Sequence, residues 1–212
     1  MSHRTADVAI VGAGILGLAH AYVAARAGKS VVVFERNPRA MGASVRNFGM
    51  IWPIGQPNGA MHQMALRSRS LWLEMLQVAK LPYRPHGSLH VLYRSDEVEV
   101  VKEFVERAPG LGYECGWLDR EATLARSHAI QPEGLLGALW SDTEFTVDPR
   151  QVLAALPAFL EERYDVRFHF STPVHSITAP HLEAGSNRWS AENIIVCSGD
   201  DFETIFRGAA ER

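Results

Sequence analysis

The sequence predicts a mixed α/β protein built on a parallel β-sheet, because its opening residues have the pattern of a strand–helix–strand unit. Residues 8–11 and 31–34 are apolar at every position. Strands of a parallel sheet are covered on both faces, so they are apolar throughout instead of alternating with polar residues. Residues 18–27 between them read as a helix, and Gly28 follows as a typical C-terminal stop.

The composition is that of a globular protein, since 47% of the 212 residues are hydrophobic, 21% are charged and the formal net charge is −3. The sequence has no basic run, so we expect no nucleic-acid partner. It has no apolar stretch of about 18 residues, so we expect no membrane segment. The two cysteines, Cys115 and Cys197, are too few for a disulfide framework, which favours a reducing, cytoplasmic location.

The middle of the chain changes character twice. Residues 37–57 contain three prolines and three glycines without periodicity, and a long irregular segment of this kind is typical of a functional loop. A helix is predicted over residues 58–80, where apolar side chains recur at helical spacing. Prolines and a glycine then precede a new set of elements. These are a predicted strand over 88–93, a helix over 96–107 and a strand over 135–140.

After residue 147 the sequence again resembles the strand and helix pattern of the first part of the chain. Asp148, Pro149 and Gln151 have the order of a helix start, with a capping Asp followed by a first-turn Pro. Short strands are then predicted over residues 166–170, 174–177, 188–190 and 193–197.

Gly12, Gly14 and Gly17 form a Gly-x-Gly-x-x-Gly motif between the first strand and the first helix, which is the context that dinucleotide binding requires. The first glycine allows a tight turn, the second lets a diphosphate approach the backbone, and the third lets helix and strand pack closely. The amino end of the helix adds free N–H groups and a positive dipole end. Glu35, at the end of the next strand, is placed to bind an adenosine ribose and disfavours a 2′-phosphate. The alternative is a glycine-rich turn with no ligand.

The chain resembles the FAD-dependent oxidoreductases of the D-amino-acid oxidase, glycine oxidase and sarcosine oxidase family. The resemblance rests on the glycine motif, Glu35-Arg36, the loop 42–49, Val147-Asp148-Pro149, Val174 and residues 194–199. It implies a Rossmann-like FAD-binding domain of parallel strands and helices, with an incomplete α+β substrate domain. The implied division assigns residues 1–80 and 148–202 to the FAD-binding domain, 81–147 to a substrate-domain insertion and 203–212 to the start of a truncated substrate-domain segment.

The same resemblance implies that the cofactor-binding residues come from four places in the chain. They are Gly12, Gly14, Ile15, Leu16 and Gly17; Glu35 and Arg36; Ser44, Asn47, Phe48 and Gly49; and Val174, Ser198 and Gly199. Ser44 would bond a phosphate, residues 47–49 would lie near the isoalloxazine, and the backbone of Val174 would meet the adenine. Ser198 and Gly199 would close over the cofactor. Turn formation is the alternative role for Ser44 and Asn47.

The activity that the resemblance implies is oxidation of the C–N bond of an amine or amino acid, by hydride transfer to FAD. Residues 46–57 are similar to a branch of the family linked to aminophosphonate catabolism. Such a reaction needs no obligatory side-chain acid or base, so we assign no catalytic residue. Family members are longer, so we expect a chain truncated at its C-terminus. Two alternatives stay open: a non-catalytic nucleotide-binding chain and an NAD-dependent dehydrogenase.

The remaining polar groups carry no predicted chemistry. His86 and His90 are four residues apart with no further ligand near them in the sequence, so no metal site is predicted. His62 could face the cofactor or lie partly exposed on its helix. Asp142, Glu144 and Asp148 are interpreted as a solvated edge or a helix cap, and Asp200 and Asp201 as caps of the next helix.

Overall fold

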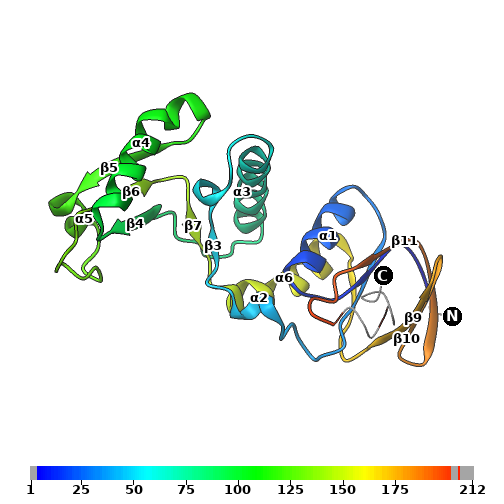
Figure 1. The fold of residues 1–212 in the computed structure, drawn as a ribbon. Coiled ribbons are helices and arrows are strands. Elements are labelled where there is room, and N and C mark those ends of the chain that lie inside the picture. Colours follow the sequence, from blue (N-terminus) through cyan, green and yellow to red (C-terminus); the bar gives the residue numbers. More distant parts are fainter. Residues whose placement is uncertain (1–3, 202–204, 206–212) are drawn as a thin grey trace. The chain divides into compact units, whose positions relative to one another are not determined.

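The computed structural model describes residues 4–201 and 205 and divides the chain into two compact units (Figure 1). The first unit is Met1–Phe48 with Asp148–Arg212, and the second is Gly49–Val147. The structure therefore groups residues 49–80 with the inserted segment, whereas the sequence suggested a boundary at residue 80. The reason is that residues 50–56 pair and hydrogen-bond with residues 113–146.

The first unit contains a six-stranded sheet in the order β8-β2-β1-β11-β10-β9. Four strands run parallel: β1 (Thr5–Val11), β2 (Val31–Phe34), β8 (Arg167–His169) and β11 (Asn187–Val196). Two antiparallel strands extend it, β9 (Val174–Thr178) and β10 (His181–Ala184). The helices are α1 (Ile15–Arg26), α2 (Ala43–Arg46) and α6 (Pro149–Tyr164). This sheet confirms the predicted α/β class with a parallel core.

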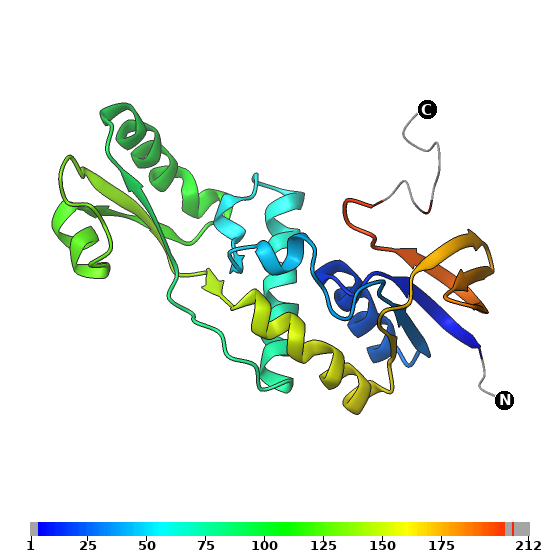
Figure 2. The same cartoon turned by 90° about the horizontal axis from the view of Figure 1, so that it is seen from below.

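Burial follows the apolar patterns of the sequence. All four residues of β2 are buried, as are the last four of β1. Helix α1 packs against β1, β2 and α6 (Figures 1 and 2). A cluster of buried side chains that includes Val11, Phe34 and Trp189 forms a hydrophobic core against this sheet. Asp148 caps α6 as predicted, since its carboxylate accepts from the amides of Arg150 and Gln151 at 2.9 and 3.4 Å.

The antiparallel end of the sheet differs from the prediction. The two strands expected at 188–190 and 193–197 are one ten-residue strand, β11. Strand β10 was not predicted, because four residues with a single large apolar side chain, Leu182, give too short a pattern. Gly185, with φ of 56°, turns the chain between β10 and β11.

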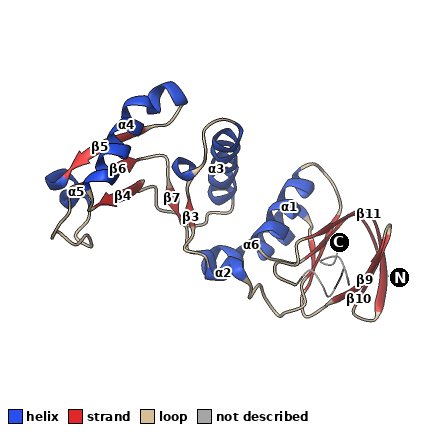
Figure 3. Ribbon diagram, in the orientation of Figure 1, coloured by secondary structure: helices blue, strands red, loops and turns tan. Residues whose placement is uncertain are grey.

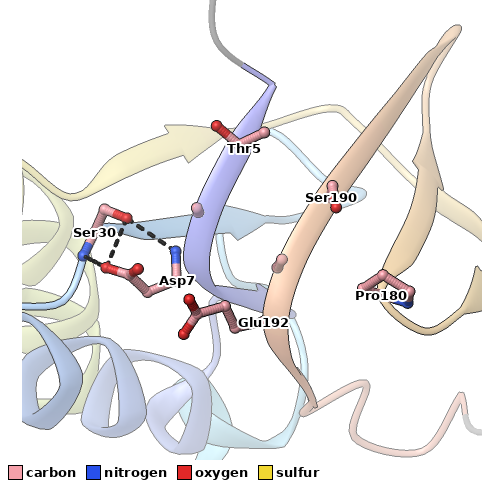
Figure 4. A pocket seen from close by; sticks show the side chains of 8 residues that line it. Thr5, Asp7, Ser30, Pro180, Ser190 and Glu192 are labelled. Atoms are coloured by element: carbon pink, nitrogen blue, oxygen red, sulfur yellow. Dashed lines mark hydrogen bonds between the residues drawn. The ribbon is translucent and has the colours of Figure 1, made fainter.

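Asp7 ties the start of β1 to the residue before β2 (Figure 4). Its carboxylate accepts from the backbone N–H of Ser30 at 2.7 Å and from the Ser30 hydroxyl at 2.9 Å. These two hydrogen bonds lower the pKa of the Asp7 carboxyl, and the bond from the Ser30 backbone has the larger effect. A carboxyl whose pKa is lower in the folded state stabilises the fold above its unfolded pKa and loses that effect as pH falls through its folded pKa.

We therefore expect Asp7→Asn to lower the thermal midpoint at neutral pH. The difference from wild type should shrink below about pH 4, where the unfolded-state carboxyl begins to be protonated. Thermal melts across the pH range measure this. Asp142→Asn, an exposed carboxylate in the second unit, is the control. A deficit of Asp7→Asn that stays constant from neutral pH down to pH 2 would contradict the assignment.

The second unit is built on an antiparallel sheet in the order β4-β6-β5 (Figure 3). Its strands are β4 (Ser88–Leu92), β5 (Cys115–Asp119) and β6 (Gly137–Ser141). Its helices are the 3-10 turn η1 (Pro53–Gly55), α3 (Ala60–Val78), α4 (Ser95–Leu111) and α5 (Arg120–Arg126). Strand β5 was not predicted, because Gly116 interrupts its apolar run. A two-stranded ribbon of β3 (Met50–Ile51) and β7 (Phe145–Thr146) forms where the chain enters and leaves the unit.

Glu144 is buried in the second unit, with 1% of its surface exposed, so the interpretation of a solvated acid was wrong for this residue. Its carboxylate accepts from the Ile54 amide at 3.1 Å, from the Thr143 hydroxyl at 2.7 Å and from the Ser88 hydroxyl at 3.1 Å. These donors come from η1, β4 and the loop after β6. The buried carboxylate therefore joins three segments that are distant in the sequence.

Glu144→Gln is expected to destabilise the protein. The amide keeps the volume of the side chain, but its nitrogen cannot accept a hydrogen bond, so at least one buried donor loses its partner. The expected loss is about 1–3 kcal/mol of unfolding free energy, measured in urea. Glu103→Gln, at an exposed pair with Arg107 on α4, is the control and should change stability by less than about 0.5 kcal/mol. Equal stabilities of the two variants would show that the network contributes little.

Candidate functional site

The glycine loop leaves the carboxyl end of β1 and leads directly into α1. The Gly12 amide donates to the Phe34 carbonyl at 2.7 Å, and the Cys197 amide donates to the Val11 carbonyl at 2.7 Å. The loop therefore begins between the ends of β2 and β11. Gly12 has φ of 103°, a conformation that L side chains rarely adopt.

Close backbone approaches explain why glycine stands at these positions. A Cβ atom at Gly12 would overlap the carbonyl oxygen of Cys197, and one at Gly17 would overlap the carbonyl oxygen of Gly12. A Cβ atom at Gly14 would lie 3.1 Å from the Ser44 hydroxyl oxygen. Gly17 thus lets α1 pack against the loop, while Gly14 keeps space open beside Ser44.

The amino end of α1 presents backbone donors. Its first helical hydrogen bond runs from the Leu18 amide to the Gly14 carbonyl at 2.9 Å, so the amides of residues 15–17 have no carbonyl within the helix. The hydroxyl oxygen of Ser44, in α2, accepts from the Ile15 amide at 3.0 Å. The first turn of α1 has no acidic side chain. The amides of Leu16 and Gly17 and the Ser44 hydroxyl hydrogen are therefore suited to an anion.

Glu35, the residue after β2, points back toward the glycine loop. One carboxylate oxygen, Oε2, accepts from the Ala13 amide at 3.0 Å. The other, Oε1, accepts from the backbone and side-chain N–H groups of Asn37 at 2.9 and 3.2 Å. A carboxylate has about four acceptor positions, so Oε2 retains room for one more donor. The side chain is only 8% exposed, which fixes its direction.

Ser198 and Gly199 follow β11 beside the start of the glycine loop. The Ser198 hydroxyl oxygen is buried and has no hydrogen-bond partner among the described residues. A Cβ atom at Gly12 would lie 3.6 Å from the Ser198 amide nitrogen, which places the two residues together. A buried hydroxyl needs a partner, and a ligand oxygen at the glycine loop would supply one.

The remaining predicted residues occupy different settings. Asn47 ends α2, and Phe48 is 73% exposed at the end of the first unit. Gly49, with φ of 75°, begins the second unit, where its carbonyl accepts from the Val147 amide at 2.9 Å. Val174 is buried at the start of β9 within the core cluster, so only its backbone could meet a ligand.

Two residues near the glycine loop were missed by the sequence analysis. Asn37 donates twice to Glu35, and its position two residues later was a usable signal because Asn and Asp often form such local hydrogen bonds. Asp201 forms an ion pair with Arg36. No sequence signal links these two, and Asp201 was expected to cap a following helix, whereas residues 202–204 lie outside the described part.

Other candidate groups belong to the second unit. His62 is buried in the second unit, with its ring 4.0 Å from that of Tyr113, so the expectation of a partly exposed histidine was wrong. His90 accepts from the Trp52 indole N–H at 3.3 Å, and burial lowers its pKa. Within residues 4–201 and 205, no group of three or more His, Cys, Asp or Glu side chains could hold a metal ion.

An open depression of about 360 Å³ lies at the opposite edge of the first sheet (Figure 4). Its lining includes Thr5, Ser30 and Glu192, at the amino ends of the parallel strands or beside them. It is therefore distinct from the glycine loop, which leaves the carboxyl end of β1. In the part of the chain that the structure describes, no helix is long and apolar enough to cross a membrane.

The chain is similar to known proteins in both sequence and fold. Residues 7–207 match the DAO family model, described as FAD dependent oxidoreductase. Glycine oxidase from Geobacillus kaustophilus is 23% identical over 210 residues, covering 94% of this chain and 55% of the relative. The crystal structure of glycine oxidase from Geobacillus kaustophilus matches with a TM-score of 0.82 and 22% identity, over 92% of this chain and 55% of the matched chain. L-Proline dehydrogenase from P. horikoshii matches with a TM-score of 0.82 and 19% identity, over 93% and 54% of the two chains.

The chain spans about half the length of the curated glycine oxidase that it matches. The family model covers nearly the whole chain, including the glycine loop, Glu35 and the segment after β11. The chain therefore belongs to the DAO family of FAD-dependent oxidoreductases.

Proposed function

We propose that the first unit binds FAD at the glycine loop and that the protein oxidises the C–N bond of an amine or amino acid. The observation that carries the proposal is that the Glu35 carboxylate binds the Ala13 amide of the glycine loop while the amino end of α1 begins two residues later, at Ile15. The amino end of α1 suits a diphosphate and the carboxylate suits a ribose. The family assignment favours FAD over the NAD-dependent alternative.

Most of the predicted cofactor-binding residues have a proposed task. The amides of Leu16 and Gly17 and the hydroxyl of Ser44 bind the diphosphate, with Gly14 and Ile15 beside them. The free position on Glu35 Oε2 accepts from a ribose hydroxyl, and the Val174 backbone meets the adenine. The buried Ser198 hydroxyl donates to the cofactor, with Gly199 beside it. Residues 47–49 lie toward the isoalloxazine.

The chemistry itself belongs to the cofactor. Bound FAD supplies a two-electron acceptor for the hydride on the carbon that bears nitrogen, and water then hydrolyses the resulting imine. The residues of this chain hold and orient the nucleotide half of the cofactor. No residue is assigned here as a proton acceptor.

The proposed substrate class is a small amine or amino acid. Two of the similar proteins are named for glycine oxidation and L-proline dehydrogenation, and both substrates are amines next to a carboxylate. The segment of residues 46–57 favours an aminophosphonate as a finer choice, because it is similar to a branch linked to such compounds. A phosphonate would replace the carboxylate as the anionic group beside the amine.

Purification of the protein tests the proposal. We expect a yellow protein that releases FAD on denaturation, and an anaerobic amine or amino-acid substrate should bleach the visible flavin band. Glycine, L-proline and 2-aminoethylphosphonate derivatives are the first substrates to compare. A colourless protein that melts at a higher temperature with NAD but not with FAD would overturn the proposal.

A second candidate is nucleotide binding without turnover, because the residues assigned above hold the nucleotide and none is assigned as a proton acceptor. It predicts bound FAD whose visible band no amine bleaches, while dithionite still does. The same anaerobic titration therefore separates the two candidates.

A further inference from the structure

Arg36 and Asp201 form an ion pair at the carboxyl edge of the first sheet. The sheet order places β2 and β11 on either side of β1. The strand register aligns Phe34, Val11 and Val196 in one row across these three strands. Arg36 follows Phe34 by two positions, and Asp201 follows Val196 by five.

The pair therefore spans the end of β1, from which the glycine loop departs. Neighbouring strands are about 4.8 Å apart, so the bridge from β2 to β11 crosses roughly 10 Å of sheet edge. Both partners lie next to residues of the nucleotide site. Arg36 follows Glu35, and Asp201 lies three residues after Ser198.

We propose that the Arg36–Asp201 ion pair holds together the two segments that flank the nucleotide site and thereby slows the release of bound FAD. This inference rests on the proposed function, because it requires FAD at the glycine loop. The pair connects residues 165 positions apart, so it joins two segments that are distant in the sequence.

The charges around the site support this role. Glu35 adjoins Arg36 and Asp200 adjoins Asp201 in the sequence, so each partner of the pair has a further carboxylate next to it in the chain. The opposite charges of Arg36 and Asp201 attract each other and so hold the two segments together. The Arg36 and Asp201 side chains are 52% and 25% exposed, so solvent screens the pair and its effect is moderate.

The test is the rate at which FAD leaves the purified holoprotein, followed by the fluorescence of released FAD. Asp201→Asn should release FAD about two- to fivefold faster at low salt, the range expected for a partly exposed ion pair. Near 1 M salt, where the Debye length is about 3 Å, the difference should vanish. Asp200→Asn removes the same charge one residue earlier and should release FAD at the wild-type rate. Asp201→Glu keeps the charge and should stay close to wild type.

A double-mutant cycle completes the test. Arg36→Gln and Asp201→Asn together should speed release by less than the product of the two single effects, since both remove the same interaction. Equal release rates in Asp201→Asn and Asp200→Asn would overturn the proposal. Slower release in Asp201→Asn would also overturn it, because Arg36 would then bind the diphosphate better alone.

Two further measurements distinguish an effect on FAD release from an effect on the stability of the fold and from a failure of FAD binding. A lower melting temperature of the Asp201→Asn apoprotein with unchanged FAD release would assign the pair to the fold alone and overturn the proposal. A wild-type protein that cannot bind added FAD would overturn the cofactor assignment and, with it, this inference. FAD-loaded proteins with equal release rates would overturn the inference only.

Discussion

Gly17→Ala should yield a protein that carries no FAD. An added Cβ atom at this position would overlap the carbonyl oxygen of Gly12, and backbone cannot move aside as a flexible side chain can. Either α1 shifts away from β1 or the glycine loop changes its path, and both changes displace the amides of Leu16 and Gly17. The overlap should also cost about 1–3 kcal/mol of stability.

The absorbance spectrum of the purified variant and its FAD titration measure this loss. Gly110→Ala is the matched control, because the space around Gly110 in α4 is open and a Cβ atom there would touch nothing within 4 Å. The control should bind FAD like wild type and gain about 0.5–1 kcal/mol of stability, as expected for Gly→Ala inside a helix. Wild-type FAD content in Gly17→Ala would mean that the diphosphate does not sit at this loop.

Glu35→Gln is expected to weaken FAD binding by about 10- to 100-fold, the effect of losing one hydrogen bond to a charged group. The amide can keep an oxygen toward the two N–H groups of Asn37. Its nitrogen then faces the Ala13 amide, so two donors meet and the acceptor for the ribose is lost.

Titration of the apoprotein with FAD, followed by flavin fluorescence, measures the affinity. Glu192→Gln changes the same charge at an exposed position on β11, beside the depression at the opposite edge of the sheet, and should bind FAD normally. If both variants bound FAD equally, Glu35 would serve only the Ala13 and Asn37 contacts.

Local sequence patterns predicted the features that depend on neighbouring residues. The apolar runs that became β1 and β2 and the glycines between them define the parallel core, because burial on both faces and close backbone packing leave few residue choices. Glu35 was predicted for the same reason, since its place at the end of β2 follows from the strand itself.

The features that were missed depend on contacts between distant residues. The partner of Arg36 is 165 positions away, and no local pattern could identify it. Glu144 resembled a solvated acid in the sequence, but three donors from separate segments make its burial possible. The division of the chain at Phe48 likewise depends on the pairing of β3 with β7.

That pairing brings the two ends of the second unit together. Gly49 and Val147 are joined by a backbone hydrogen bond of 2.9 Å, and β3 and β7 continue it as a ribbon. Because its two ends meet, the second unit can change in length without moving the two points at which the chain leaves and re-enters the first unit. During evolution such a module can be enlarged, shortened or exchanged to suit a new substrate, while the parallel sheet that receives it keeps its sequence and its ligand.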